Sequence, residues 1–289
     1  METDFRQLTE ETFAAHWQQQ LETCKEISPD LARLAERLVE LGFKVPVLAS
    51  STPVVSADVT VVPTEEGEIV ATESRKLHEY EWTNVLPDFR SWLIETLTPV
   101  DGKYQLDEST EIQSCRLGWY DEYKLVRLSD PHWINRRLRL YYLTGPNADL
   151  IRLNGTSPPI HEVNAKAPIK LTVDNVLSYL VFFCFFVHGE RGPFYVMETM
   201  NDPFIDAFRS LPVDPQLLKT TLAIIEGNIK PAVLVRINVD GKYLCSAYIH
   251  YSNALFKADF AVAPSGMIEM LNDDPIAADM PTRIEAPLV

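Results

Sequence analysis

The fold is decided by the stretch Thr172–Gly189, TVDNVLSYLVFFCFFVHG, which is the most apolar part of the chain. Between Val176 and Val187, Ser178 and Tyr179 are the residues that interrupt the apolar run. A half-buried strand would alternate apolar and polar residues, and a surface helix would keep a polar stripe, so neither pattern fits. We therefore predict one helix that is apolar nearly all round and packs on more than one side.

The two ends of this stretch predict where the helix begins and ends. Thr172 can cap the N-terminus, and the carboxylate of Asp174 is favourable there because the helix dipole is positive at that end. Gly189 can adopt the left-handed conformation that closes a helix. The run is shorter than the roughly 20 apolar residues that a bilayer requires, and charged residues flank it, so we expect no membrane span.

Cys184 and His188 lie four residues apart and would share one helical face. That spacing could serve a metal or a thiolate pair. Free cysteine is more often buried and unreactive, so we interpret Cys184 as a buried thiol and His188 as a histidine at the helix end.

Composition limits the classes of function. The chain has 289 residues and a net charge of −15, and no segment of it is basic, which argues against nucleic-acid partners and anionic membranes. The four cysteines have neither CxxC nor zinc-ribbon spacing, and the N-terminus lacks the apolar core of an export signal. We therefore expect reduced thiols, a cytoplasmic location and no metal. Motifs for a phosphate-binding loop, a dinucleotide site or a hydrolase nucleophile are absent from the sequence, so no cofactor is expected.

The N-terminal part differs in character from the rest. Apolar periodicity predicts two helices within residues 5–42, and the Val- and Thr-rich residues 45–74 predict a β-hairpin. We divide the chain into residues 1–75 and 76–289, and leave open whether the helical pair folds separately or packs on the main domain.

The larger part mixes helices and strands. A helix is predicted at Pro87–Leu97, and residues 99–122 are interpreted as irregular. The further predicted strands are Tyr123–Ser129, Arg137–Thr144, Asp149–Leu153 and Pro193–Thr199. Two further helices are predicted at Pro203–Leu211 and Pro215–Glu226.

Residues 232–271 carry the clearest strand signal, with turns expected at Asp240-Gly241 and Ser252-Asn253. Counting from these turns places Ser246 opposite Asp259 in an antiparallel meander. One face of the meander is predicted to be core. Residues 272–289 are interpreted as an acidic tail that wraps the surface. The order of elements predicts an α+β fold: an N-terminal helical pair, then mixed helices and the meander packed on the buried aromatic helix.

The segment Leu153–Ala165, LNGTSPPIHEVNA, is the best candidate for a ligand site. We interpret it as a proline-stiffened loop, with His161 and Glu162 as candidate catalytic groups because histidine can act as a general base near neutral pH. The ligand-binding candidates in this segment are Asn154, Ser157 and Asn164. Such residues also make turns and caps, and a purely structural loop is the more common outcome.

The second face of the meander is a further candidate, with Tyr248 and His250 as possible ligand-binding residues. A mixed polar face on an antiparallel sheet is more often simply solvated, and we expect that here.

The sequence leaves open whether the protein is an enzyme. It favours a non-catalytic protein-interaction or regulatory module, with a small-molecule-binding protein or metal-independent enzyme around residues 153–165 as the alternative. A deep pocket beside that segment would favour the alternative, and an exposed apolar patch would favour the interaction module.

Overall fold

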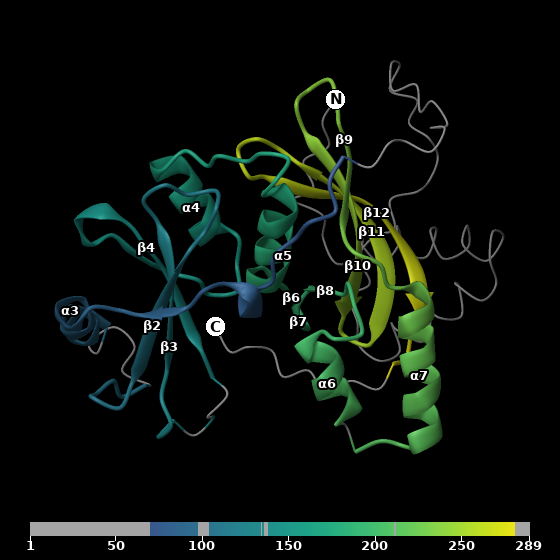
Figure 1. Cartoon of the computed structure of the whole chain (residues 1–289), viewed down its shortest axis with the longest axis horizontal. Coiled ribbons are helices and arrows are strands. Elements are labelled where there is room, and N and C mark those ends of the chain that lie inside the picture. The colour runs from purple at the N-terminus through teal and green to yellow at the C-terminus, as the bar shows by residue number, and fades with distance from the viewer. Residues whose placement is uncertain (1–69, 98–103, 134, 136–137, 211, 281–289) are drawn as a thin grey trace, which may run out of the picture. The chain divides into compact units, whose positions relative to one another are not determined.

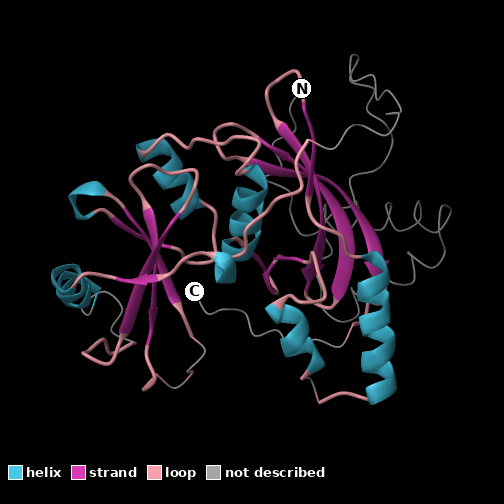
Figure 2. Cartoon of the chain, in the orientation of Figure 1, coloured by secondary structure: helices cyan, strands magenta, loops and turns pink. Residues whose placement is uncertain are grey.

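The computed structural model describes residues 70–97 and 104–280, apart from 134, 136–137 and 211 (Figure 1). The described residues form the predicted α+β fold, with two five-stranded antiparallel sheets (Figure 2). The predicted helical pair, residues 45–69 of the predicted hairpin and Cys24 lie outside the described residues. The domain division near residue 75 stays a prediction.

The first sheet joins its strands in chain order. The strands are β1 (Thr83–Asn84), β2 (Glu111–Arg116), β3 (Lys124–Ser129), β4 (Leu140–Thr144) and β5 (Leu150–Arg152). One face packs against helix α3 (Pro87–Leu97), as Val126 and Leu128 share a hydrophobic cluster with Leu93. The other face belongs to a second cluster that contains Leu125 and Leu143. The central strands are therefore buried on both faces.

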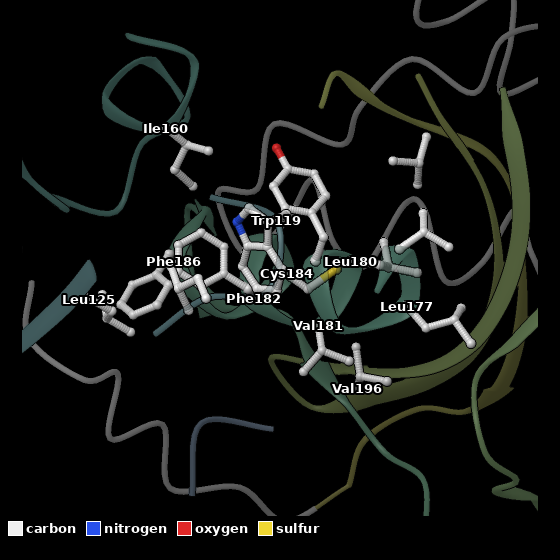
Figure 3. Packing of buried hydrophobic residues seen from close by; sticks show 14 of the residues in the cluster. Trp119, Leu125, Ile160, Leu177, Leu180, Val181, Phe182, Cys184, Phe186 and Val196 are labelled. Carbon is white, nitrogen blue, oxygen red and sulfur yellow. The ribbon is translucent and has the colours of Figure 1, made fainter. Parts of the chain in front are cut away.

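Helix α5 (Val176–Phe186) is the predicted apolar helix, and it packs on more than one side. Figure 3 shows Phe186 on the side of Leu125 from the first sheet, whereas Leu177 lies toward the strands of the second sheet. The ring of Phe182 contacts Trp119, with 5.3 Å between the ring centroids. Both sheets thus bury apolar side chains against the same helix, which makes it the centre of the described core.

The ends of α5 differ from the prediction. The helix begins after Asn175, whose side-chain oxygen accepts a hydrogen bond from the backbone N–H of Thr172 at 2.9 Å. Thr172 therefore precedes a turn and is not the N-cap. Gly189 closes no helix, because it pairs with Gly192 in the two-stranded sheet of β6 (His188–Gly189) and β7 (Gly192–Pro193).

The second sheet contains the meander. Its strands are β8 (Tyr195–Val196), β9 (Val233–Ile237), β10 (Tyr243–Tyr251), β11 (Ala254–Val262) and β12 (Ile268–Ala277). The pairing of Ser246 with Asp259 confirms the register that the sequence predicts. The face that carries Cys245 and Phe260 is buried against the α5 cluster, as predicted. Helices α6 (Pro203–Arg209) and α7 (Pro215–Asn228) pack on the opposite face, through residues such as Ile205 and Ile225.

The turn from β9 to β10 differs from the predicted two-residue turn. The N–H of Asn238 donates to the carbonyl of Lys242 at 2.9 Å, so three residues form the loop between them. Gly241 takes a positive φ of 75° in this loop, which glycine adopts without steric cost. A register shift follows between Leu244 and Cys245.

Three further expectations from the sequence are wrong. The irregular stretch 99–122 contains β2, whose buried residues do not alternate, so its sequence lacks a strand period. The predicted loop contains helix α4 (Pro158–Lys166), because prolines are compatible with the first turn of a helix. The predicted acidic tail begins inside β12, which is exposed on both faces and therefore shows no apolar alternation.

A strap of residues 70–76 covers part of β9. Ala71 bridges Leu234, and the N–H of Leu234 donates to the carbonyl of Ala71 at 2.8 Å. The ammonium group of Lys76 binds Asp202 and the carbonyl of Val196, so the strap is held by a nearly buried ion pair. These partners lie more than 100 residues apart in sequence, and no local pattern predicts them.

Candidate functional site

His161 and Glu162, the candidate catalytic residues, lie side by side on α4 but have different surroundings. The ring of His161 lies against Phe183 of α5, with 5.8 Å between the ring centroids, and burial lowers the pKa of its imidazole. Glu162 is exposed and forms an ion pair with Lys166 at 2.8 Å. Neighbouring helical residues point about 100° apart, so the two side chains do not converge on one reacting atom.

The start of the segment is occupied by local turn contacts. The side-chain oxygen of Asn154 accepts hydrogen bonds from the N–H and the hydroxyl of Thr156 at 3.1 and 2.6 Å. The carbonyl of Ser157 accepts the first hydrogen bonds of α4, from Ile160 and His161. These are the self-contained contacts that asparagine and serine commonly make before a helix.

Asn164 connects three elements of the core. Its side-chain oxygen accepts a hydrogen bond from the hydroxyl of Tyr120, and its NH₂ group lies 3.2 Å from the hydroxyl of Tyr179 and 3.3 Å from the carbonyl of Ser265. Tyr179 donates in turn to the carbonyl of Gly266 at 2.7 Å. This network joins α4, α5 and the turn before β12, so the amide of Asn164 is already used within the fold.

Tyr248 and His250 lie on the second face of the meander, where we expected solvent. His250 is instead 3% exposed, and its ring lies 4.7 Å from that of Phe204 of α6, measured between centroids. Tyr248 packs at the border of the same cluster. Burial lowers the pKa of His250 to about 4, so its imidazole is neutral at pH 7. The expectation of a solvated face is therefore wrong around His250, because α6 and α7 cover it.

Cys184 and His188 also have structural surroundings. Cys184 is a buried free thiol whose pKa rises to about 12 through burial, so it is not a thiolate at neutral pH. Cys115 and Cys245 are likewise buried free thiols. His188 lies beyond α5, in β6, and burial lowers the pKa of its imidazole. A metal-binding pair on one helical face is therefore not formed.

A cluster that the sequence analysis missed lies at the end of β3. Atoms of Asp107, Asp130 and His132 that could bind a metal lie within 4.8 Å of one another. The buried carboxylate of Asp130 already accepts hydrogen bonds from the hydroxyl of Thr110 at 2.8 Å and of Ser109 at 3.0 Å. Burial raises the pKa of Asp130, but these hydrogen bonds and the one from the backbone of His132 outweigh it and leave the pKa lowered. The carboxylate of Asp130 is therefore occupied in holding the segment around Ser109 and Thr110 against the turn that follows β3.

The outer edge of β12 has no described strand paired with it. β12 is ten residues long and stands at the end of the second sheet, where it pairs with β11 alone among the described strands (Figures 1 and 2). Seven consecutive residues, Glu269–Pro275, are exposed. Met270 and Leu271 are large apolar side chains in this stretch that keep 42% and 53% of their surface exposed.

The charges along β12 are of one sign. Glu269, Asp273 and Asp274 are acidic, and the strand contains no lysine or arginine. Glu269 lies 3.5 Å from Lys242, whereas neither Asp273 nor Asp274 forms an ion pair with any described residue. The strand signal in the sequence ends at Leu271, and the rest of β12 falls in the predicted acidic tail. Exposure on both faces removes the alternation that would have extended the strand to Ala277.

No protein-family model, curated protein or solved structure matches this chain. None of the helices in the described ranges is both long enough and apolar enough to cross a bilayer.

Proposed function

We propose that the protein is a non-catalytic protein-interaction module and that its interaction surface is the outer edge of β12. The observation that carries this proposal is the ten-residue length of an edge strand that has no described partner on its outer side. An exposed strand edge presents unpaired N–H and C=O groups, which can add a strand from another chain.

The other sheet edges support this choice by contrast. In the first sheet, β1 has two residues and β5 has three, and short edge strands are a common protection against pairing. In the second sheet, β8 has two residues and β9 is partly covered by the strap. Among the described edges, β12 alone is long and has no described strand on its outer side, although its register shifts and Pro275 also restrain edge pairing.

The side chains of β12 also suit a protein partner. Met270 and Leu271 provide exposed apolar surface, and Met267 just before the strand is 55% exposed. Methionine is flexible and polarisable, which suits a surface that adapts to a partner. An added strand would gain backbone hydrogen bonds and contacts with these side chains.

The alternative, a small-molecule-binding protein or metal-independent enzyme around residues 153–165, stays a prediction. The contacts of Glu162 and Asn164 give it no added support, since each is bonded within the fold. No second function is proposed.

The proposal can be tested with a displayed library of random twelve-residue peptides selected against the full chain. We expect enriched peptides to slow hydrogen exchange of residues 268–277, because an added strand protects the outward-facing amides. Leu271→Glu should weaken their binding, since it places a charge within the apolar contact. Val239→Glu is a matched control, because Val239 is a fully exposed valine in the β9–β10 loop. Failure to enrich any peptide, or protection elsewhere in the chain, would show the proposal to be wrong.

A further inference from the structure

We propose that the β12 edge accepts an extended basic segment of a partner protein, with lysine or arginine side chains placed beside Asp273 and Asp274. This inference rests on the proposed function and specifies the chemistry of its partner. Two observations carry it: the position of the two acids in the register of β12, and the acidity of the strand.

The register places the two carboxylates on opposite faces of the sheet. Asp273 pairs with Ala258, whose side chain belongs to the core face, and Asp274 pairs with Lys257 on the other face. Adjacent residues of an added strand also point to opposite faces. Two consecutive basic residues in the partner would therefore each meet one carboxylate.

The two acids differ in how much of their charge is compensated. Lys257 is the cross-strand neighbour of Asp274, whereas Asp273 faces an alanine. Side chains directly opposite in an antiparallel pair lie about 4.5–5.5 Å apart at Cβ, close enough for charge interaction. Asp273 therefore contributes the larger share of the attraction for a basic strand.

The register shifts between β11 and β12 indicate which part of β12 an added strand would pair with. The register of β12 with β11 shifts between Asp259 and Phe260, which leaves Leu271 as an extra residue, and shifts again beside Pro275. The regular stretch between the shifts is Asn272–Pro275, and it contains both acids. Pro275 has no N–H and cannot donate to an added strand, so the residues before it carry the backbone donors of this stretch.

A second copy of this chain fits the edge poorly. Antiparallel pairing of two β12 strands through their regular stretches would bring the acids of one copy near those of the other, and like charges across a strand pair are destabilising. The net charge of −15 adds repulsion between copies. The same acids that repel a second copy attract a basic strand. The edge is therefore expected to prefer a basic partner over self-association.

The test uses three synthetic peptides and the full chain at physiological ionic strength. The first is acetyl-Thr-Val-Thr-Ile-Lys-Lys-Val-Thr-Val-Thr-amide, the second has two glutamates in place of the lysines, and the third has two serines. Fluorescence anisotropy gives the affinities, and hydrogen exchange locates the binding. We expect the lysine peptide to bind about tenfold more tightly than the glutamate peptide and to protect residues 268–277.

Charge-reversed variants of the protein assign the effect to the two acids. Asp273→Lys/Asp274→Lys should lose the preference for the lysine peptide and favour the glutamate peptide. Asp273→Asn alone should weaken the lysine peptide more than Asp274→Asn does. The matched control is Asp121→Lys/Glu122→Lys, which changes the same charge at two adjacent exposed acids in the loop between β2 and β3 and should leave the preference intact.

The outcomes separate this inference from the proposed function. If the serine and glutamate peptides protect β12 as well as the lysine peptide, the edge accepts strands but the basic partner is wrong. An unchanged preference in Asp273→Lys/Asp274→Lys would also overturn the inference. If none of the peptides protects β12, the absence of protection by the lysine peptide contradicts the basic partner. The peptide-library selection then tests the proposed interaction function separately.

Discussion

Two polar regions of this protein, the segment around α4 and the strand β12, differ in how their polar groups are used. The α4 segment has more varied chemistry, with histidine, glutamate, serine and asparagine close together in sequence. Asn154, Glu162 and Asn164 nevertheless bond within the fold. β12 offers mainly carboxylates and backbone, but its outer side has no described partner.

This difference shows that a high density of polar residues does not by itself mark a ligand site. Most buried or half-buried polar groups find an internal partner because leaving them unpaired is costly, and the ring Nε2 atoms of His188 and His250 are exceptions. Groups that remain exposed without partners are the ones that can bind something else. The comparison predicts that substitutions at the half-buried Asn164 and the buried His250 cost stability, whereas substitutions at exposed Glu162 and on β12 cost little.

The largest expected effect concerns His250 and depends on pH. Its folded pKa of about 4 lies below the ordinary value of 6.5, so the unfolded chain binds the proton more tightly than the folded chain does. The stability contributed by the neutral ring is complete above pH 6.5 and is lost as the pH falls toward 4. The loss amounts to about 3 kcal/mol.

The measurement is urea denaturation of wild type and His250→Leu at several values between pH 7.5 and pH 4. We expect the stability advantage of wild type over the variant to shrink by about this amount as the pH falls. Parallel curves for the two proteins would contradict the burial of His250 beneath α6.

The next effect concerns Asn164. Asn164→Ala removes the acceptor of the Tyr120 hydroxyl and the contacts to Tyr179 and Ser265, and leaves buried polar groups unpaired. We expect a loss of about 2 kcal/mol in the free energy of unfolding, measured by chemical denaturation. Asn154→Ala is the control, because Asn154 is exposed and bonds within its own turn, and it should cost about 0.5–1 kcal/mol. Equal costs at both sites would show that Asn164 does not hold three elements together.

The sequence predicts the centre of the fold well, because long apolar runs and strand alternation dominate there. The apolar run of α5 reflects burial on several sides, and the alternation of β10 and β11 reflects one buried face of the sheet. The pairing of Ser246 with Asp259 follows from the position of the turn at Ser252-Asn253. The limits of α5 were less predictable, because the helix begins after Asn175, whose side chain bonds back to the N–H of Thr172 and does not cap the helix.

The candidate residues were harder to interpret from sequence, for two physical reasons. The burial of His250 depends on α6 and α7, which pack on the meander from outside it. The bonds of Asn164 reach Ser265 about 100 residues further along the chain. Long-range packing of this kind leaves no local pattern, and neither does the exposure of β12 on both faces.

A smaller effect is expected at Glu162. Its ion pair with Lys166 is exposed to solvent, and exposed pairs contribute little to stability. Glu162→Gln should therefore give a melting temperature close to that of wild type. A marked drop in melting temperature would mean that α4 depends on this pair.

The smallest effect is expected on β12 itself. Leu271→Gln replaces an exposed apolar side chain at an irregular position, so the free energy of unfolding should change by less than about 0.5 kcal/mol. Thermal and chemical denaturation would measure it. A loss comparable with that of Asn164→Ala would mean that Leu271 is covered within the folded protein.

The central claim is that the outer edge of β12, which has no described partner strand, is open to a partner protein, and hydrogen exchange of the full chain without any ligand tests it most directly. β11 lies between two strands, so its amides should exchange slowly along its whole length. In β12, the amides that do not bond to β11 should exchange close to the rate of an unprotected chain, giving alternating fast and slow positions. Uniformly slow exchange throughout residues 268–277 would show that the edge is already paired, and would contradict the account.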